Sequence, residues 1–134
     1  TEPTAVDLCG AVTLTSSHVS GTAFNMGTST VTYTCTDDAG NTSTLSFNVN
    51  VTDIELPQIL SLPLDLSVGT DAVSCSGIAT WSEPTTQDCD SATLISTHAS
   101  GSAFSLGDTV VTYTATDPTG NQSTGSFTVT VIDE

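Results

Sequence analysis

The fold is decided by two stretches near the end of the chain, VVTYTATD at residues 110–117 and SFTVTV at residues 126–131. In both stretches apolar side chains alternate with hydroxylated ones. This period of two predicts strands with one face in a core and the other in water. Between them lies DPTGN at residues 117–121, in which Pro, Gly and Asn favour a tight turn. We therefore expect two strands joined by a turn within a two-sheet sandwich.

Further strand signals precede this pair at short spacing, separated by Gly, Pro, Asn and Asp, and helical periodicity is absent throughout the sequence. The composition agrees, because Ser and Thr make up roughly a third of the chain and Thr favours half-buried pleated surfaces. The expected fold class is all-β. The expected strands are residues 58–66, 72–81, 92–99, 103–106, 109–116 and 123–132.

The sequence repeats itself at a constant offset of 80 residues. Such a period indicates a tandem array, and 134 residues hold one complete unit and the later two thirds of another. After one inserted residue, Glu2-Pro3-Thr4 also matches Glu83-Pro84-Thr85. We expect an incomplete domain at residues 1–53 and a complete domain at residues 54–134. The matched pairs include Cys9 and Cys89, His18 and His98, Phe24 and Phe104, Gly27 and Gly107, Tyr33 and Tyr113, and Phe47 and Phe127.

Three motifs of the complete unit carry a family resemblance: WSEPT at residues 81–85, GSAFSLG at residues 101–107, and VVTYTATD with its following strand. Together they resemble the hyalin repeat, an immunoglobulin-like module of extracellular proteins. The resemblance also covers residues 1–53, which lack the opening two strands equivalent to residues 54–81. It implies two tandem immunoglobulin-like β-sandwiches, an extracellular or cell-surface location, roles in adhesion and matrix architecture, and no catalytic residues.

The charge composition excludes several functions. The chain has no Lys or Arg and 15 acidic residues, which gives a formal net charge of −15. Without cations it cannot neutralise the phosphates of nucleic acids or of an anionic membrane surface, nor clamp a nucleotide. We also expect no membrane insertion, because no apolar stretch is long enough for a spanning helix. No nucleophile elbow or triad spacing occurs, so we expect no enzyme activity.

Four cysteines fit an oxidising compartment. Cys75 and Cys89 match positions that members of the resembled family often bridge, which implies a Cys75–Cys89 disulfide. Cys9 is the counterpart of Cys89, and its corresponding partner would lie upstream of Thr1. The intrachain pairing left for it is Cys9 with Cys35, and the alternative for Cys35 is a buried free thiol that packs as a small hydrophobe.

Asparagine residues offer candidate modification sites. Asn41, Asn50 and Asn121 begin Asn-X-Ser/Thr tripeptides and are candidate N-glycosylation sites, and outward Ser and Thr are candidates for O-glycans. The alternative for Asn41 and Asn121 is a purely structural role, since each follows a turn Gly at the same repeat position.

Calcium is the one metal that the sequence suggests, and no cofactor is certain. Calcium takes about six to eight oxygen ligands, usually with several carboxylates. Carboxylates are expected to converge where the chain enters the complete sandwich, with no Lys or Arg to offset their repulsion. The alternative is a solvated acidic loop cluster in which Asp forms turns. The candidate ligands are Asp53, Glu55, Asp88, Asp90 and Asp117.

A first sandwich without its opening strands would expose an apolar groove and unpaired strand edges. Either the chain is a piece of a longer array, or a neighbouring subunit supplies the strand by β-augmentation. Head-to-tail addition of this kind does not close, so its product is a fibre. The leading hypothesis is a structural extracellular module that forms or extends a fibre or surface stalk with copies of itself. The alternative is an adhesion or carbohydrate-contacting spacer of a larger surface protein.

Overall fold

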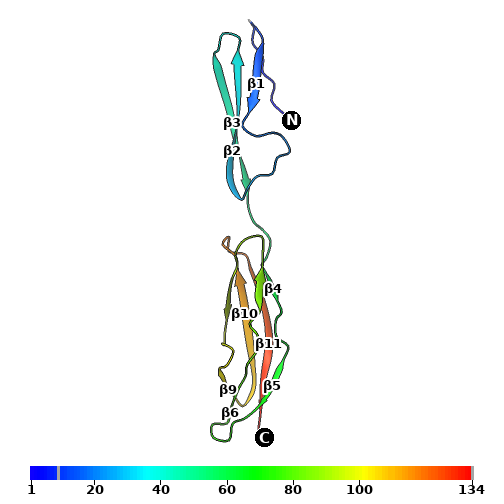
Figure 1. The fold of residues 1–134 in the computed structure, drawn as a ribbon, viewed down its shortest axis with the longest axis vertical. Coiled ribbons are helices and arrows are strands. Elements are labelled where there is room, and N and C mark those ends of the chain that lie inside the picture. The colour runs from blue at the N-terminus through cyan, green and yellow to red at the C-terminus, as the bar shows by residue number, and fades with distance from the viewer. Residues whose placement is uncertain (9, 134) are drawn as a thin grey trace. The chain divides into compact units, whose positions relative to one another are not determined.

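The structure, a computed structural model, describes residues 1–8 and 10–133. It divides the chain into two units, Thr1–Asp53 and Ile54–Glu134, named unit 1 and unit 2 below. Every regular element in the described residues is a β-strand, so the all-β fold class is confirmed (Figure 1). None of the described segments forms a helix able to span a membrane.

Unit 2 is a sandwich built on one long antiparallel hairpin. The described residues form β4 (Gln58–Leu60), β5 (Leu66–Gly69), β6 (Ser76–Ile78), β7 (Thr85–Gln87), β8 (Thr93–Ser96), β9 (Ala103–Ser105), β10 (Gly107–Thr116) and β11 (Gln122–Ile132). The hairpin of β10 and β11 is extended by β8 on one side and by β5, parallel to β11, on the other. The short pairs β4-β7 and β6-β9 complete the unit (Figure 1).

The core of unit 2 lies on the inward face of this hairpin, where apolar residues alternate with outward Thr and Ser. Burial of each such side chain contributes about 1.5–3 kcal/mol. Residues 54–81, named the opening segment below, supply most of the cover. The core residues of 4% exposure or less include Ala79, Phe104, Val111, Tyr113, Phe127, Val129 and Val131. Packed against them are Ile59, Leu62, Leu66, Val68, Trp81 and Leu94.

The opening segment is more broken than the sequence suggests. The single strand expected at residues 58–66 is two strands, β4 and β5, because Ser61 takes a positive φ of 59° and Pro63 follows it. The strand expected at residues 72–81 shrinks to β6, since Asp71 holds a turn by accepting hydrogen bonds from the Val73 and Ser74 amides. β7 was not expected, because TTQ has no apolar alternation.

Unit 1 repeats the hairpin but not its cover. Its described strands are β1 (Val12–Ser16), β2 (Gly27–Asp37) and β3 (Thr42–Val51), in one sheet of order β1-β2-β3. Val31 lies opposite Phe47, as Val111 lies opposite Phe127 in unit 2. Phe47 is 52% exposed, whereas Phe127 is 4% exposed. The same phenylalanine of the repeat is therefore a core residue in unit 2 and a surface residue in unit 1.

Candidate functional site

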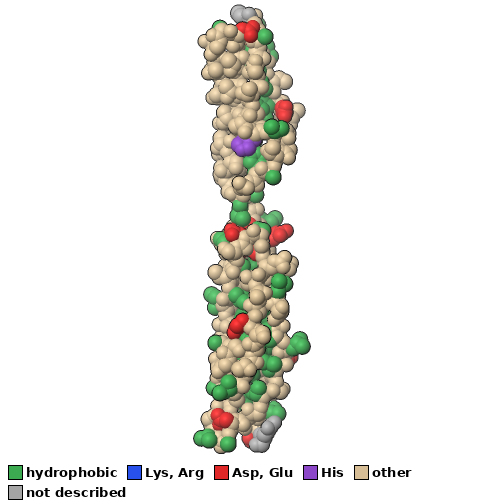
Figure 2. Space-filling view, in the orientation of Figure 1, with side chains coloured by type: hydrophobic (Ala, Val, Ile, Leu, Met, Phe, Trp, Pro, Cys, Tyr) green, Lys and Arg blue, Asp and Glu red, His purple; other side chains and the backbone are tan. Residues whose placement is uncertain are grey.

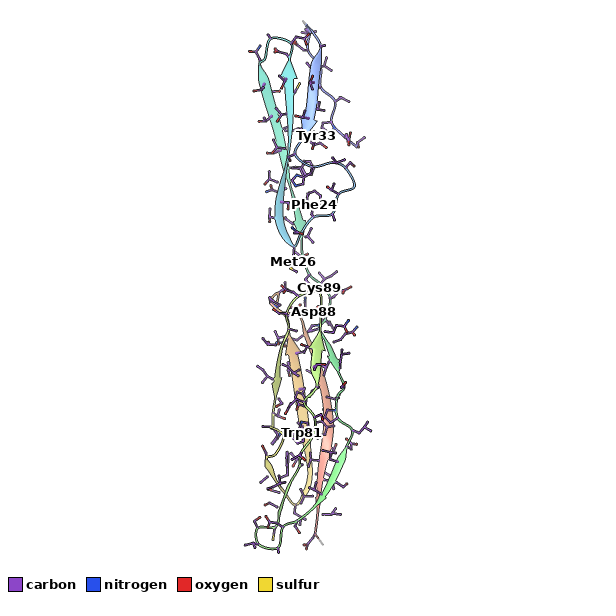
Figure 3. All side chains as sticks on the ribbon, in the orientation of Figure 1. Phe24, Met26, Tyr33, Trp81, Asp88 and Cys89 are labelled. Atoms are coloured by element: carbon purple, nitrogen blue, oxygen red, sulfur yellow. The ribbon has the colours of Figure 1, made fainter. Side chains whose placement is uncertain are left out.

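The site begins with what closes the core of unit 2. The indole Nε1 of Trp81 donates a hydrogen bond of 2.7 Å to the hydroxyl of Tyr113, which itself donates one of 2.5 Å to Glu83. The indole meets Phe127 edge-on, with ring centroids 5.1 Å apart, and lies 6.1 Å from Phe104 (Figure 3). Burial, and then the hydrogen bond to Glu83, raises the pKa of Tyr113. One side chain of the opening segment thus joins three strands of the unit.

The backbone of Trp81 is also held. Its amide donates to Ser100 Oγ at 2.8 Å, and the Ser100 hydroxyl donates to the Trp81 carbonyl at 2.9 Å. Because a single serine satisfies both backbone groups, the chain is fixed at this residue without a ladder partner. Trp81 is therefore positioned through its main chain as well as through its ring.

In unit 1 the counterparts of these contact residues surround an open hollow. We name the side of its sheet that carries Val31, Tyr33, Leu45, Phe47 and Val49 the open face. A hollow of about 370 Å³, named the aromatic hollow, lies on this face, and Figure 3 labels Phe24 and Tyr33 of its lining. The residues that line it include the counterparts of the Trp81 contacts in unit 2 and of Glu83, which accepts a hydrogen bond from Tyr113. These counterparts are Glu2, Ser20, Phe24, Tyr33 and Phe47.

The hollowing continues along the open face. A second hollow of about 200 Å³ lies beside Val6, Leu14, Tyr33, Cys35 and Leu45. Leu45 is 68% exposed, although it lies on the same face as the buried Val31. An apolar face of this kind on a three-stranded sheet marks a surface that another element covers.

The outer edge of β3 is the second feature of the site. In unit 2 the equivalent edge of β11 pairs in parallel with β5, from Val129 opposite Leu66 to Ile132 opposite Gly69. In the sheet order of unit 1, β3 has β2 as its one neighbour among the described residues. An open edge next to an open apolar face is a template for strand addition.

One difference between the two faces could have been found from the repeat alignment. At the position of Leu45, unit 2 has Gly125. A Cβ at Gly125 would lie 3.0 Å from Leu62 Cδ2 and 3.8 Å from Ile59 Cδ1, so glycine leaves room for the opening segment. Leu45 therefore gives the open face of unit 1 a different shape from the covered face of unit 2.

The candidate glycosylation sites differ in how their amides are used. Asn121 Nδ2 donates two hydrogen bonds, to Asp117 at 2.7 Å and to Thr119 at 2.9 Å. Asn41 Nδ2 donates one, to Asp37 at 2.8 Å. Asn50 is exposed and uses its Oδ1, which accepts a bond of 2.8 Å from Thr28. An attached glycan replaces one Nδ2 hydrogen, so Asn50 is the best placed acceptor and Asn121 the poorest.

Asp117 is a turn residue. It is 5% exposed, and its two oxygens accept bonds from Thr119 and from the backbone and side-chain amides of Asn121. Burial raises its pKa, but these hydrogen bonds and one from the Gly120 amide together lower it below the ordinary value. Asp37 and Asn41 repeat the arrangement in unit 1. Both oxygens of Asp117 are therefore engaged in its turn, as in the alternative in which Asp is a turn former.

Three other candidate ligands lie in the segments beside β4 and β7, and within the described residues the three do not come together at ligating distance. Asp88 and Asp90 follow β7, and Glu55 precedes β4, whose first residue lies opposite the last residue of β7 (Figure 3). Asp88 Oδ1 accepts a bond of 2.8 Å from the Cys89 amide, while its Oδ2 is buried and has no hydrogen-bond partner within the described part of the chain. Asp53 belongs to unit 1.

The expected Cys75–Cys89 disulfide is wrong for this structure, in which Cys75 is an exposed free thiol. Cys75 directly precedes β6, which lies at one end of unit 2 (Figure 1), whereas Cys89 lies at the other end (Figure 3). Extended chain rises about 3.3 Å per residue, whereas a disulfide needs Cα atoms within about 7 Å. Cys35 is a half-buried free thiol, and its expected partner Cys9 lies outside the described residues.

The surface is acidic and hydroxylated. Figure 2 shows acidic and apolar side chains, with histidine, set among other side chains and backbone on one face, and no Lys or Arg among them. A surface of this kind has no cation to pair with its carboxylates.

Known proteins resemble the chain over both units. The HYR domain family matches residues 1–51 and 52–131. Hyalin of Lytechinus variegatus is 38% identical over 138 residues, covering 99% of this chain and 26% of that protein. The mouse "Sushi, von Willebrand factor type A, EGF and pentraxin domain-containing protein 1" is 38% identical over 129 residues, covering 91% and 4%. A "Serine-rich adhesin for platelets" of Staphylococcus aureus is 32% identical over 116 residues, covering 80% and 5%.

The chain thus spans about a quarter or less of the length of these relatives. The family matches cover both repeats that the sequence shows, and the motifs on which the resemblance rested lie within them. The resemblance to hyalin repeats is confirmed: the chain belongs to the HYR domain family, with two matches in tandem, and is an extracellular or cell-surface module.

Proposed function

We propose that the chain is a structural, non-catalytic module of an extracellular fibre or cell-surface stalk, in which hyalin repeats follow one another head to tail. The partners are further hyalin repeats, on neighbouring chains or as members of one array. A strand donated by a neighbouring chain completes the open sandwich of unit 1. The observation that carries this proposal is the exposure of Phe47, at 52%, against 4% for its counterpart Phe127.

An apolar face such as the open face of unit 1 stabilises a protein only when another segment covers it. In unit 2 the cover is the opening segment, which contributes both a strand edge and side chains. In a donor-strand assembly the same contacts are made between chains, so that each addition leaves a new acceptor at the growing end. Filament growth then follows from the incomplete module itself.

Adhesion is the second candidate function. It is favoured by the similarity to the serine-rich adhesin for platelets, whose name describes attachment. In this alternative the two units are a spacer that contacts carbohydrate or carries a binding domain away from the surface. Attached glycans at Asn50, and calcium at Glu55, Asp88 and Asp90, are accessories that either function can use.

Electron microscopy of native extracellular material, labelled with an antibody to unit 2, tests the structural function. We expect labelled regular filaments, with density that crosses from one chain to the next at unit 1. Dispersed single molecules under native conditions would exclude the fibre. If such molecules are retained by glycan-coated surfaces, the adhesion alternative takes its place.

A further inference from the structure

We infer that the open face of unit 1 accepts the opening segment of another hyalin repeat, with an indole in the aromatic hollow and a small side chain opposite Leu45. This rests on the proposed function in one respect, that the segment comes from a neighbouring chain. The inference names the partner by its chemistry: an extended, apolar segment that resembles residues 54–81 but differs from them at one position.

The aromatic hollow has the composition of the Trp81 site. In unit 2 the indole is held by Tyr113, Phe104 and Phe127, and their counterparts Tyr33, Phe24 and Phe47 line the hollow in unit 1. The hydroxyl of Tyr33 has no hydrogen-bond partner in residues 1–8 and 10–133, and an indole Nε1 is a donor without acceptor capacity. Indole is thus the group that matches this hollow both in apolar surface and in its single donor.

The main chain of an incoming indole-bearing residue also has its partner in place. Ser100, which satisfies both backbone groups of Trp81, corresponds to Ser20 on the wall of the aromatic hollow. Glu2, the counterpart of Glu83, lies on the same wall. The polar groups that position Trp81 in unit 2 therefore have equivalents in unit 1. They make the hollow more specific for an indole-bearing residue than a purely apolar cleft would be.

The edge of β3 sets the register of the incoming strand. The parallel pairing of β5 with β11 places Leu66 opposite Val129 and Val68 opposite Val131. The equivalent edge in unit 1 runs from Val49 to Val51, at the end of β3. A donated strand in this register pairs in parallel with β3 and turns its apolar residues onto the open face.

Leu45 decides which opening segment fits. In unit 2, Leu62 packs so closely on Gly125 that an added Cβ would lie 3.0 Å from it. A whole leucine side chain stands at this position in unit 1, so a segment with leucine at the place of Leu62 collides with it. The favoured donor has Gly, Ala or Ser there, which makes Leu45 the residue that selects among otherwise similar repeats.

A second copy of this chain is not the occupant. The opening segment of such a copy carries Leu62, which collides with Leu45, and it is already held in unit 2 through Trp81. The partner is therefore a different hyalin repeat.

Peptide binding to the full chain tests the inference. The probe is a synthetic peptide of residues 54–82 with Cys75→Ser, made in three forms: with Leu62, with Leu62→Ala, and with Leu62→Ala plus Trp81→Ala. We expect the Leu62→Ala peptide to bind about tenfold or more tightly than the Leu62 peptide. Adding Trp81→Ala should weaken binding at least about tenfold. Calorimetry gives the affinities, and hydrogen exchange should show new protection along β3.

The matched protein variant is Leu45→Gly, which should let the Leu62 peptide bind as well as the Leu62→Ala peptide. The peptide comparison alone decides the matter if that variant does not fold. Equal affinity of the three peptides, absence of binding, or a dimer of the chain that no peptide dissociates would overturn the inference. Peptide binding without native filaments would instead reject the fibre, and filaments without peptide binding would reject the inference alone.

Discussion

The indole Nε1 of Trp81 lies 2.7 Å from the hydroxyl of Tyr113 and donates a hydrogen bond to it, tying the opening segment of unit 2 to its central hairpin. Tyr113 is buried, and its hydroxyl donates a hydrogen bond to Glu83. Buried polar groups are costly unless they are satisfied, so this chain of bonds requires the opening segment to be in place. Unit 1 has the tyrosine without the tryptophan, and this contrast underlies the proposals above.

Replacing Trp81 with Phe should destabilise unit 2. The indole donor is lost while most of the ring remains, so we expect a loss of about 1–3 kcal/mol in the free energy of unfolding. Urea unfolding followed by circular dichroism measures it, because Trp81 is the one tryptophan of the chain and its fluorescence disappears with the substitution. As a control, Ile95→Ala at a 68% exposed position should stay within about 0.5 kcal/mol of the wild type. Equal stability of both variants would contradict the role of this bond.

Unit 2 should lose stability in alkali. The pKa of Tyr113 is raised by burial and by Glu83, so the neutral phenol is favoured in the folded state. Its contribution is fully present below the pKa of an unfolded tyrosine, about 10, and is lost as the pH rises through the higher folded value. Absorbance of tyrosinate should show Tyr113 titrating together with unfolding, and Tyr113→Phe should remove that phase. Alkaline unfolding that is unchanged in Tyr113→Phe would exclude it.

Asp117→Asn should lower the melting temperature of unit 2 at neutral pH. Burial raises the pKa of Asp117, but its hydrogen bonds, chiefly those with Asn121, outweigh this effect and lower the pKa below the ordinary value. The folded state therefore favours the carboxylate. This contribution is present above the unfolded pKa, about 3.9, and is lost as the pH falls through the lower folded value. The difference between wild type and variant, measured by calorimetry, should therefore shrink in acid. Asp90→Asn removes the same charge from an exposed loop and serves as the control; a pH-independent difference would contradict the prediction.

Calcium should raise the melting temperature of the chain relative to a chelator. A ligand that binds only the folded state stabilises it in proportion to the logarithm of its concentration over its dissociation constant. Asp88→Asn should reduce this increment, because Asp88 has a buried oxygen without a hydrogen-bond partner in the described residues. Asp117→Asn should leave the increment unchanged, since that carboxylate is engaged in its turn. An identical melting temperature in calcium and chelator would remove the metal site.

Secretion from a host that attaches N-glycans should modify Asn50 more fully than Asn121. Asn50 is exposed and its amide nitrogen is uncommitted in the hydrogen bonds described, whereas Asn121 Nδ2 donates two. Peptide mass spectrometry measures the occupancy. We also expect Asn50→Gln to leave the melting temperature of the unglycosylated chain unchanged and Asn121→Gln to lower it. Higher occupancy at Asn121 would reverse the ranking.

Much of the fold could be predicted from the sequence, because the strongest signals in the sequence are local. The alternation in residues 110–117 and 126–131 predicts β10 and β11, and the offset of 80 residues predicts the same hairpin in unit 1. β7 was missed, because its residues TTQ pair with β4 without an apolar pattern of their own. A strand held by its neighbours leaves little trace in its own residues.

The sequence by itself determined the all-β class, the tandem repeat and the acidic surface, which follow from its periodicity and composition, and the family, which its motifs indicate by resemblance. Only the tertiary structure decided that β6, which Cys75 precedes, lies at the end of unit 2 opposite Cys89 (Figures 1 and 3), and that both oxygens of Asp117 accept hydrogen bonds in its turn. It also decided that Gly125 makes room for Leu62 where unit 1 has Leu45. Those facts depend on which distant segments meet, and proximity in space is set by strand direction and register, which no local pattern records.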